Sequence, residues 1–198
     1  MNKLLLFSIL LFSSYTFSME NEKSVEIITL NPALWEEYKN LRLYALTDEP
    51  LAFGMSEKDD MIKPNDHWYH LLYAAQQEKD VWKLFAQIDG QLVGTVGAVR
   101  MWHDQEYMKH IVTIVGLYVL PEFRKKGIGT LLMKKLIDKL KKDSTIGQVI
   151  LLVTETQKTA INLYEKIGFN VTGIIPRGIK FDEQYYDTFM MRLFGKVS

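Results

Sequence analysis

A short basic segment with two glycines, in the second half of the chain, has the composition of a phosphate-binding turn. It reads Arg124-x-x-Gly127-x-Gly129, and Lys125 and Lys126 add two further cations. Glycines at a helix start let a ligand approach the backbone, and the unpaired N–H groups of the first turn then point at an anion. The segment therefore predicts binding of a pyrophosphate. The alternative is an ordinary strand–turn–helix connection, in which the glycines only ease the turn.

Two common phosphate motifs do not fit this segment. A P-loop carries a lysine directly after its second glycine, and no lysine follows Gly129. A dinucleotide fingerprint needs three glycines in a strand–helix–strand unit, whereas here the helix is expected to follow a hairpin. The segment therefore indicates a phosphorylated ligand held in a different way.

A second group of residues marks a helix further along the chain. Ala160, Ile161, Tyr164 and Ile167 recur at helical spacing, and Gly168 is placed to end the helix. From this spacing alone, Tyr164 would be a core aromatic residue.

Together these two segments resemble the central motifs of the GNAT superfamily of N-acetyltransferases. Residues 124–129 match the pattern Q/R-x-x-G-x-G/A, which lies between a strand and an amphipathic helix in that family. Residues 160–169 nearly match the pattern A-x-x-L-Y-x-K-x-G-F. A weaker similarity to the first helix and loop of some bacterial members lies at 42–46 and 50–54. Nearly all of the resemblance is carried by the segment from Val115 to Tyr164.

The resemblance implies an enzyme that transfers an acetyl group from acetyl-CoA to a primary amine by direct attack in a ternary complex. The strand end at Leu117 to Val119 would bind the pantetheine arm, and the backbone amides of 125–130 would hold the pyrophosphate. Many members carry Asn where this chain has Gln157, which can also form a hydrogen bond but has a longer side chain. The implied cofactor-binding residues are Leu117, Val119, Arg124, Lys125, Lys126, Gly127, Ile128, Gly129, Thr130 and Gln157.

Tyr164 stands at the position of the family's general acid, which protonates the departing CoA thiolate. A phenol suits that step, because its ordinary pKa of about 10 is matched to a basic leaving group. The resemblance thus favours a catalytic role for Tyr164 over a purely structural one.

The general base is not identified by the sequence, because the predicted strand 111–119 contains no carboxylate. Polar residues precede that strand, and each could act through water or be a solvated loop residue. They are His103, Asp104, Glu106 and His110. No spacing of His, Asp or Glu suggests a metal site, so no metal is expected.

The missing carboxylate and Gln157 also leave room for a different function. The same fold could serve as a non-catalytic acyl-CoA-binding regulatory module, since a fold by itself does not determine function. The acceptor of an enzyme is equally open: small molecules, peptides and proteins all present amines.

The framework for these residues follows from the apolar pattern of the rest of the chain. Alternating or apolar runs predict strands, and Asp89-Gly90 suits the type I′ turn of a hairpin. The predicted strands are 25–29, 81–88, 91–99, 111–119, 149–153, 171–179 and 185–193. The predicted helices begin at Pro32, with Asn31 as the cap, near Asp66, near Gly127 and near Ala160.

This order of elements indicates one α/β domain of the GNAT type, spanning 25–198. Its central sheet should be mixed and mostly antiparallel, with six to seven strands flanked by about four helices. The last two strands could support a homodimer.

Composition limits the class of protein further. Of 198 residues, 47% are hydrophobic, which is enough to fill the core of one domain. Lys plus Arg and Asp plus Glu both number 24, and this balance argues against a nucleic-acid partner. The absence of cysteine excludes disulfides, thiolate metal sites and a cysteine nucleophile.

The first eighteen residues differ from the rest. Lys3 precedes an apolar run at 4–12 and a polar stretch at 13–18, as in a secretory signal peptide. The run is too short for a stable membrane span, which needs about 20 apolar residues. Alternatively, 1–18 precede a true start at Met19. The need for acetyl-CoA favours a cytoplasmic location, whereas a genuine signal peptide would mean that the protein is exported. An exported protein could also have a different function, as an interaction protein at the cell surface.

Overall fold

The computed structural model describes residues 24–193, and these form a single seven-stranded sheet in the order β1-β2-β3-β4-β5-β7-β6. Every neighbouring pair is antiparallel except β4 and β5, which run parallel. The predicted mixed, mostly antiparallel sheet is therefore confirmed. The strands are β1 (Glu26–Ile28), β2 (Val81–Ile88), β3 (Gln91–Val99), β4 (Ile111–Val119), β5 (Gln148–Thr154), β6 (Phe169–Phe181) and β7 (Gln184–Leu193). The signal-peptide-like segment 1–18 lies outside the described residues.

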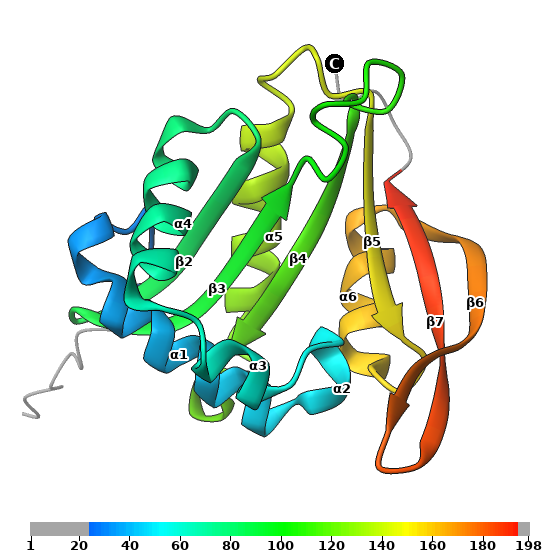
Figure 1. Ribbon diagram of the computed structural model, residues 1–198, viewed down its shortest axis with the longest axis horizontal. Coiled ribbons are helices and arrows are strands. Elements are labelled where there is room, and N and C mark those ends of the chain that lie inside the picture. The colour runs from blue at the N-terminus through cyan, green and yellow to red at the C-terminus, as the bar shows by residue number, and fades with distance from the viewer. Residues whose placement is uncertain (1–23, 194–198) are drawn as a thin grey trace, which may run out of the picture.

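Helices cover both faces of the sheet (Figure 1). They are α1 (Trp35–Asp48), α2 (Pro50–Phe53), α3 (Glu57–Met61), α4 (Asn65–Gln77), α5 (Ile128–Leu140) and α6 (Lys158–Ile167), with short 3-10 turns at Pro32–Leu34 and Pro121–Phe123. Buried side chains of α5 and α6 pack on one face, and those of α1 and α4 pack on the other. Within residues 24–193, no helix has the length and apolar composition needed to cross a membrane.

The prediction of about four helices omitted α2 and α3. Both are too short for an apolar period to show. Pro50 opens α2 at a position where its missing N–H costs nothing. Ser56 and Asp59 cap α3 reciprocally: each side chain accepts a hydrogen bond from the other residue's backbone N–H.

Strand β2 illustrates how side chains are divided between the two faces. Its alternate residues Trp82, Leu84 and Ala86 are buried in the core beneath α5. Phe85 points the other way, and its ring meets that of Tyr38 in α1 with centroids 5.3 Å apart. Lys83 shares this second face, because successive residues of a strand alternate.

The parallel pair β4 and β5 separates halfway along its length. Pairing runs only from Ile111 opposite Gln148 to Ile114 opposite Leu151. Beyond that point β4 continues to pair with β3, and β5 with β7, so the two strands diverge (Figure 1). The residues 115–119 therefore present backbone N–H and C=O groups on the side where a sheet neighbour is missing.

Candidate functional site

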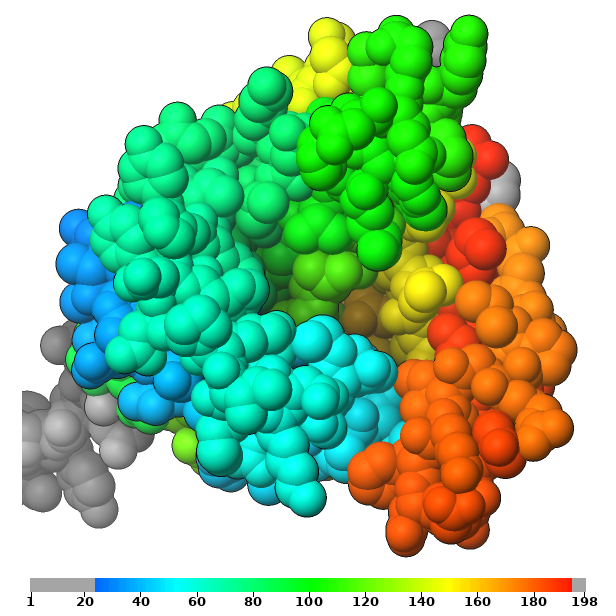
Figure 2. All heavy atoms as spheres, in the orientation of Figure 1, coloured from blue at the N-terminus to red at the C-terminus, as the bar shows by residue number. Residues whose placement is uncertain are grey.

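A cleft of about 1340 Å³ opens where β4 and β5 diverge. Its lining comes from α1, the α2–α4 region, strands β2 to β5, the start of α5, and α6. Figure 2 shows the hollow on one face, between the helices of 50–77, the loop around Met101 and the yellow surface of β5. Segments far apart in the sequence therefore meet in one cavity.

The predicted phosphate-binding turn forms one wall of this cleft. Gly127 is the residue before α5 and has φ +81°, a left-handed conformation that suits glycine. A Cβ added to Gly127 would meet no atom within 4 Å, so the space beside it is open. The first-turn amides from Ile128 to Thr130 have no partner within the helix and border the same space. The turn therefore fits an anionic ligand such as a pyrophosphate.

A bulge in β4 forms the inner end of the cleft. The register between β3 and β4 shifts between Thr95 and Gly97, and Gly116 has φ +64°. A bulge leaves one residue of the strand outside the ladder. Leu117 and Val119, both predicted to contact the cofactor, line the cleft next to this bulge. Backbone polar groups are thus available at the point where the turn and the strand edge converge.

Within residues 24–193, the Arg124 side chain forms hydrogen bonds and ion pairs with other residues of the protein, unlike that of the neighbouring Lys125. Its Nε donates a hydrogen bond to the Val119 carbonyl at 2.9 Å, and its Nη1 lies 3.1 Å from Glu49 Oε1. Its Nη2 forms an ion pair with Asp48. Two carboxylates therefore already balance this guanidinium, and a direct phosphate contact by Arg124 stays a prediction.

Gln157 belongs to the same network. Its Nε2 lies 3.4 Å from Glu49 Oε2, and the residue also lines the cleft at the start of α6. Asp48, in turn, accepts a hydrogen bond from Tyr118 Oη at 2.8 Å. Burial, with the Asp48 hydrogen bond, raises the pKa of Tyr118. The end of α1 is thereby fastened to β4, to the phosphate-binding turn and to α6.

Tyr164 projects from α6 into the lining of the cleft and is 8% exposed. Its ring packs against Phe169, with centroids 6.1 Å apart. Burial raises the pKa of its phenol, because a low-polarity environment disfavours the phenolate. Tyr164 is therefore protonated at neutral pH, which is the form that a proton donor needs.

The polar residues proposed from the sequence as bases lie outside the cleft. His103 pairs with Asp104 at 3.1 Å and Glu106 with Lys109 at 2.7 Å, all on the exposed loop before β4. None of His103, Asp104, Glu106 and His110 is among the residues that line the cavity.

Other charged residues, which the sequence analysis did not single out, do line the cleft opposite α6. Asp60 is 1% exposed and accepts hydrogen bonds from Arg42 Nε at 2.8 Å and from Lys63 Nζ at 2.5 Å. Burial and the charge of Lys63 lower the pKa of the nearby His67. Lys83 in β2 is 7% exposed, and burial, reinforced by Arg42, lowers its pKa from 10.5 to about 7. A lysine within the apolar run 81–86 was the available signal.

We expect Asp60→Asn to lower the free energy of unfolding at about pH 7 by about 2 kcal/mol, because two charged hydrogen bonds weaken. Burial raises the pKa of Asp60, but hydrogen bonds from Lys63 and Arg42 outweigh it, and the net shift is downward. Its contribution is therefore present above the unfolded-state pKa and lost as pH falls through the folded value.

Urea unfolding at about pH 7 and about pH 3 measures both effects. The variant should lose less stability between these conditions than the parent. The exposed Asp66→Asn is the matched control, expected to behave like the parent. Equal stability of Asp60→Asn and parent at neutral pH would contradict the assigned ion pairs.

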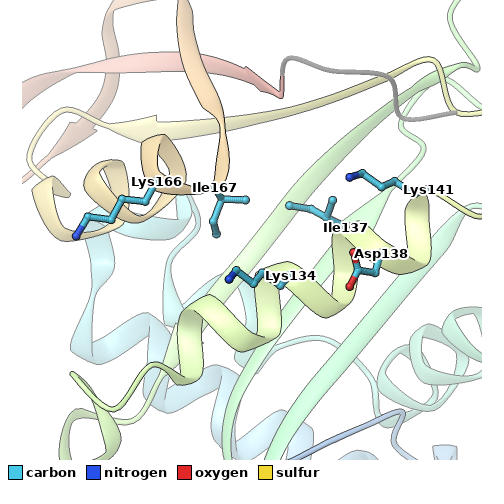
Figure 3. A pocket seen from close by; sticks show the side chains of 6 residues that line it. All are labelled: Lys134, Ile137, Asp138, Lys141, Lys166 and Ile167. Atoms are coloured by element: carbon cyan, nitrogen blue, oxygen red, sulfur yellow. The ribbon is translucent and has the colours of Figure 1, made fainter.

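A second, smaller pocket of about 290 Å³ lies between α5 and α6 (Figure 3). Ile137 and Ile167 face each other across it, and the other lining residues are charged. They are Lys134, Asp138, Lys141 and Lys166. It contains neither the phosphate-binding turn nor Tyr164, so the larger cleft is the candidate site.

Known proteins share both the sequence pattern and the fold. The model of the acetyltransferase (GNAT) family matches residues 42–169. An N-alpha-acetyltransferase of Sulfurisphaera tokodaii is 26% identical over 133 residues, which are 61% of this chain and 79% of that protein. A GNAT-family acetyltransferase of Streptococcus pneumoniae superposes with a TM-score of 0.76 at 20% identity, over 85% and 98% of the two chains. A Salmonella typhimurium protein, solved with its cofactor acetyl-CoA, gives 0.73 at 19% identity, over 88% and 95%.

Proposed function

Because this chain belongs to the GNAT acetyltransferase family, we propose that it transfers the acetyl group of acetyl-CoA to a primary amine by direct attack within a ternary complex. The observation that carries the proposal is the convergence of three features on one cleft. These are the glycine-bounded start of α5, the unpaired edge of β4 and the buried phenol of Tyr164. A purely regulatory acyl-CoA-binding module would not require the phenol.

In this proposal the chain binds acetyl-CoA along the opening between β4 and β5. The amides of 128–130 face the pyrophosphate, with the positive end of the α5 dipole behind them. Lys125 and Lys126 add cations at the rim, and the β4 edge at Leu117 and Val119 holds the pantetheine arm. Acetyl-CoA supplies an activated thioester, and the residues of the chain position it.

Tyr164 provides the proton for the departing sulfur. Tyr164 lines the cleft. The raised pKa of its phenol keeps the hydroxyl protonated until the departing sulfur becomes basic. Backbone N–H groups at the β4 bulge near Gly116 are positioned to stabilise negative charge on the carbonyl oxygen. Proximity of the two bound substrates supplies much of the remaining rate.

The charges of the cleft bear on the class of acceptor. Two carboxylates line it, Glu49 and Asp60, and each is paired with cations of the chain. A polyamine would find no unpaired carboxylate among the described lining residues. A peptide α-amine, as the names of the archaeal relatives indicate for those proteins, is therefore the first acceptor to test. The acetyl-CoA requirement favours a cytoplasmic location.

We expect acetyl-CoA at about 100 times its dissociation constant to raise the free energy of unfolding of the full chain by about 2.7 kcal/mol. Thermal unfolding with and without ligand measures this, and free CoA should give a smaller or equal shift. Release of CoA in the presence of a panel of peptide and small-molecule amines then tests transfer. A folded protein that shows no shift at millimolar acetyl-CoA would refute the cofactor site, and a shift without turnover would favour the regulatory module.

A further inference from the structure

A buried lysine reaches across the sheet to the bulge in β4. Lys83 of β2 pairs in register with Gly97 of β3, which pairs with Val115 of β4. A Cβ at Gly97 would lie 3.1 Å from Lys83 Cδ, and a Cβ at Gly116 would lie 3.5 Å from Lys83 Nζ. Two glycines thus make room for the side chain to lie flat over β3. Its amine consequently lies beside the backbone of the bulge.

The lysine amine at this position lacks an acidic partner. Among residues 24–193, no carboxylate lies within ion-pair distance of Lys83, and its Nζ instead lies 4.8 Å from the centroid of the Tyr38 ring. The negative charge of Asp60 does act on Lys83, but Arg42 and Lys63 already bind both oxygens of that carboxylate. The residue is nine-tenths buried and lines the cleft.

The groups packed around Lys83 determine its charge. Tyr38 and Arg42 face it from α1, Asp60 and Lys63 from the α3 region, and His67 lines the same cleft from α4. Burial disfavours the ammonium form most, Arg42 adds to this effect, and Asp60 opposes it. The pKa of Lys83, lowered to about 7, brings the neutral amine within reach near neutral pH.

We propose that Lys83 is the general base of the transferase, taking a proton directly from the acceptor ammonium at the β4 bulge. This inference rests on the proposed function, since it presumes acetyl transfer at that bulge. No residue proposed as base from the sequence lines the cleft, whereas Lys83 does. Its amine lies beside Gly116 of the β4 bulge, where the proposed function places the thioester carbonyl.

The proton balance of the reaction is consistent with this role. The acceptor enters as an ammonium ion and leaves as an amide, so its nitrogen loses two protons. Neutral Lys83 takes the first and passes it to solvent in the cleft. The freed lone pair forms the C–N bond as the C–S bond breaks, and Tyr164 protonates the sulfur. The second proton from the nitrogen returns to Tyr164 through water, and one proton is released overall.

The protonation of Lys83 can be measured independently of turnover. Selective ¹³C labelling of lysine Cε and NMR titration of the full chain, with Lys83→Met for assignment, should give a Lys83 midpoint near 7. The ordinary lysine pKa of about 10.4 is the value against which this midpoint is compared. A Lys83 midpoint in the range of exposed lysines would overturn the inference even if the protein acetylates amines.

Kinetics then test the role. The kcat/KM of the parent for the acceptor should fall below about pH 7, as the base becomes protonated. Lys83→Met should lower kcat/KM at least tenfold near neutral pH and move this acid limb up to the pKa of the acceptor amine itself, while acetyl-CoA still stabilises the protein. Lys79→Met is the matched control and should retain both the rate and the limb.

Because the chain has no cysteine, Lys83→Cys offers a single site for chemical rescue. Alkylation with 2-bromoethylamine restores an amine at nearly the lysine length, made less basic by the sulfur. The inference requires that alkylation restore activity and shift the acid limb to lower pH. Rescue without a shift, or full activity of Lys83→Met with its limb intact, would overturn it. A parent that binds acetyl-CoA yet acetylates no amine would instead overturn the proposed function.

Discussion

Tyr164→Phe is expected to lower kcat about 100-fold at neutral pH while leaving the affinity for acetyl-CoA nearly unchanged. The substitution removes only the hydroxyl, and the ring still packs against Phe169 in the core beneath α6. Departure of the sulfur would then depend on water, which is a poor donor inside a cleft. Steady-state rates at saturating acetyl-CoA, together with ligand-induced shifts in thermal midpoint, measure both parts.

The exposed Tyr73→Phe serves as the control for a phenol lost elsewhere and should behave as the parent. The thermal midpoint of Tyr164→Phe without ligand should also remain near that of the parent, since a buried hydroxyl is replaced by hydrogen. An unchanged kcat would remove Tyr164 from the mechanism. A parallel loss of acetyl-CoA affinity would show instead that the phenol shapes the cofactor site.

The elements that sequence predicted well are those encoded by neighbouring residues. Asp89 and Gly90 adopt φ of 49° and 82°, as the predicted type I′ turn requires. Gly168 ends α6 with φ 108°, in the left-handed conformation expected of a helix C-cap. In both cases the residue types alone restrict the backbone, so no knowledge of tertiary contacts was needed.

The first helix was predicted less accurately, because a single predicted helix covers two separate elements, a 3-10 turn and α1. Asn31 does cap a helical segment, and its side chain accepts a hydrogen bond from Ala33 N at 2.9 Å. That segment is a 3-10 turn, however, and α1 begins only at Trp35. Leu34 lies at helical spacing with the buried Tyr38 and Leu41 but is 42% exposed, because the change of helix type alters the angular spacing of the side chains.

The composition of the site was less predictable, because it depends on contacts between distant segments. Arg124 matched a motif position, but its partners Asp48 and Glu49 lie at the end of α1. The spacing of residues along the chain contains no sign of that pairing. The phosphate contact of Arg124 stays a prediction, and the sequence gives no sign of the carboxylates that the fold brings to it.

The burial of Lys83 could not be predicted from the sequence either, because it also depends on contacts between separate segments. Within β2 it interrupts the apolar run 81–86, and the usual interpretation would be a strand edge or an outward-facing side chain. Its burial results from Gly97 and Gly116 on the two following strands, which leave the space it occupies. Only the register of three strands reveals that the amine reaches the bulge.

Gly129→Val is expected to lower the affinity for acetyl-CoA at least 100-fold. At 100 times the parent's dissociation constant, acetyl-CoA stabilises the parent by about 2.7 kcal/mol, and this stabilisation should be lost in the variant. A Cβ at Gly129 would lie 3.3 Å from Leu163 Cδ1 of α6 and 3.9 Å from Val119 Cγ2 of β4. The branched methyl groups would therefore intrude between the first turn of α5, the β4 edge and α6. These are the three walls of the proposed cofactor path.

Crowding against Leu163 would also lower the stability of the unliganded protein, and that effect must be separated from ligand binding. The double variant Gly129→Val with Leu163→Ala relieves the contact on α6 but retains the methyl groups beside the amides. Its thermal midpoint without ligand should recover relative to Gly129→Val, while acetyl-CoA still produces no shift. If the double variant regains the full ligand-induced shift, the effect of the valine is packing between α5 and α6. The glycine would then serve helix contact, and the amides of 128–130 would lose their assignment as the pyrophosphate site.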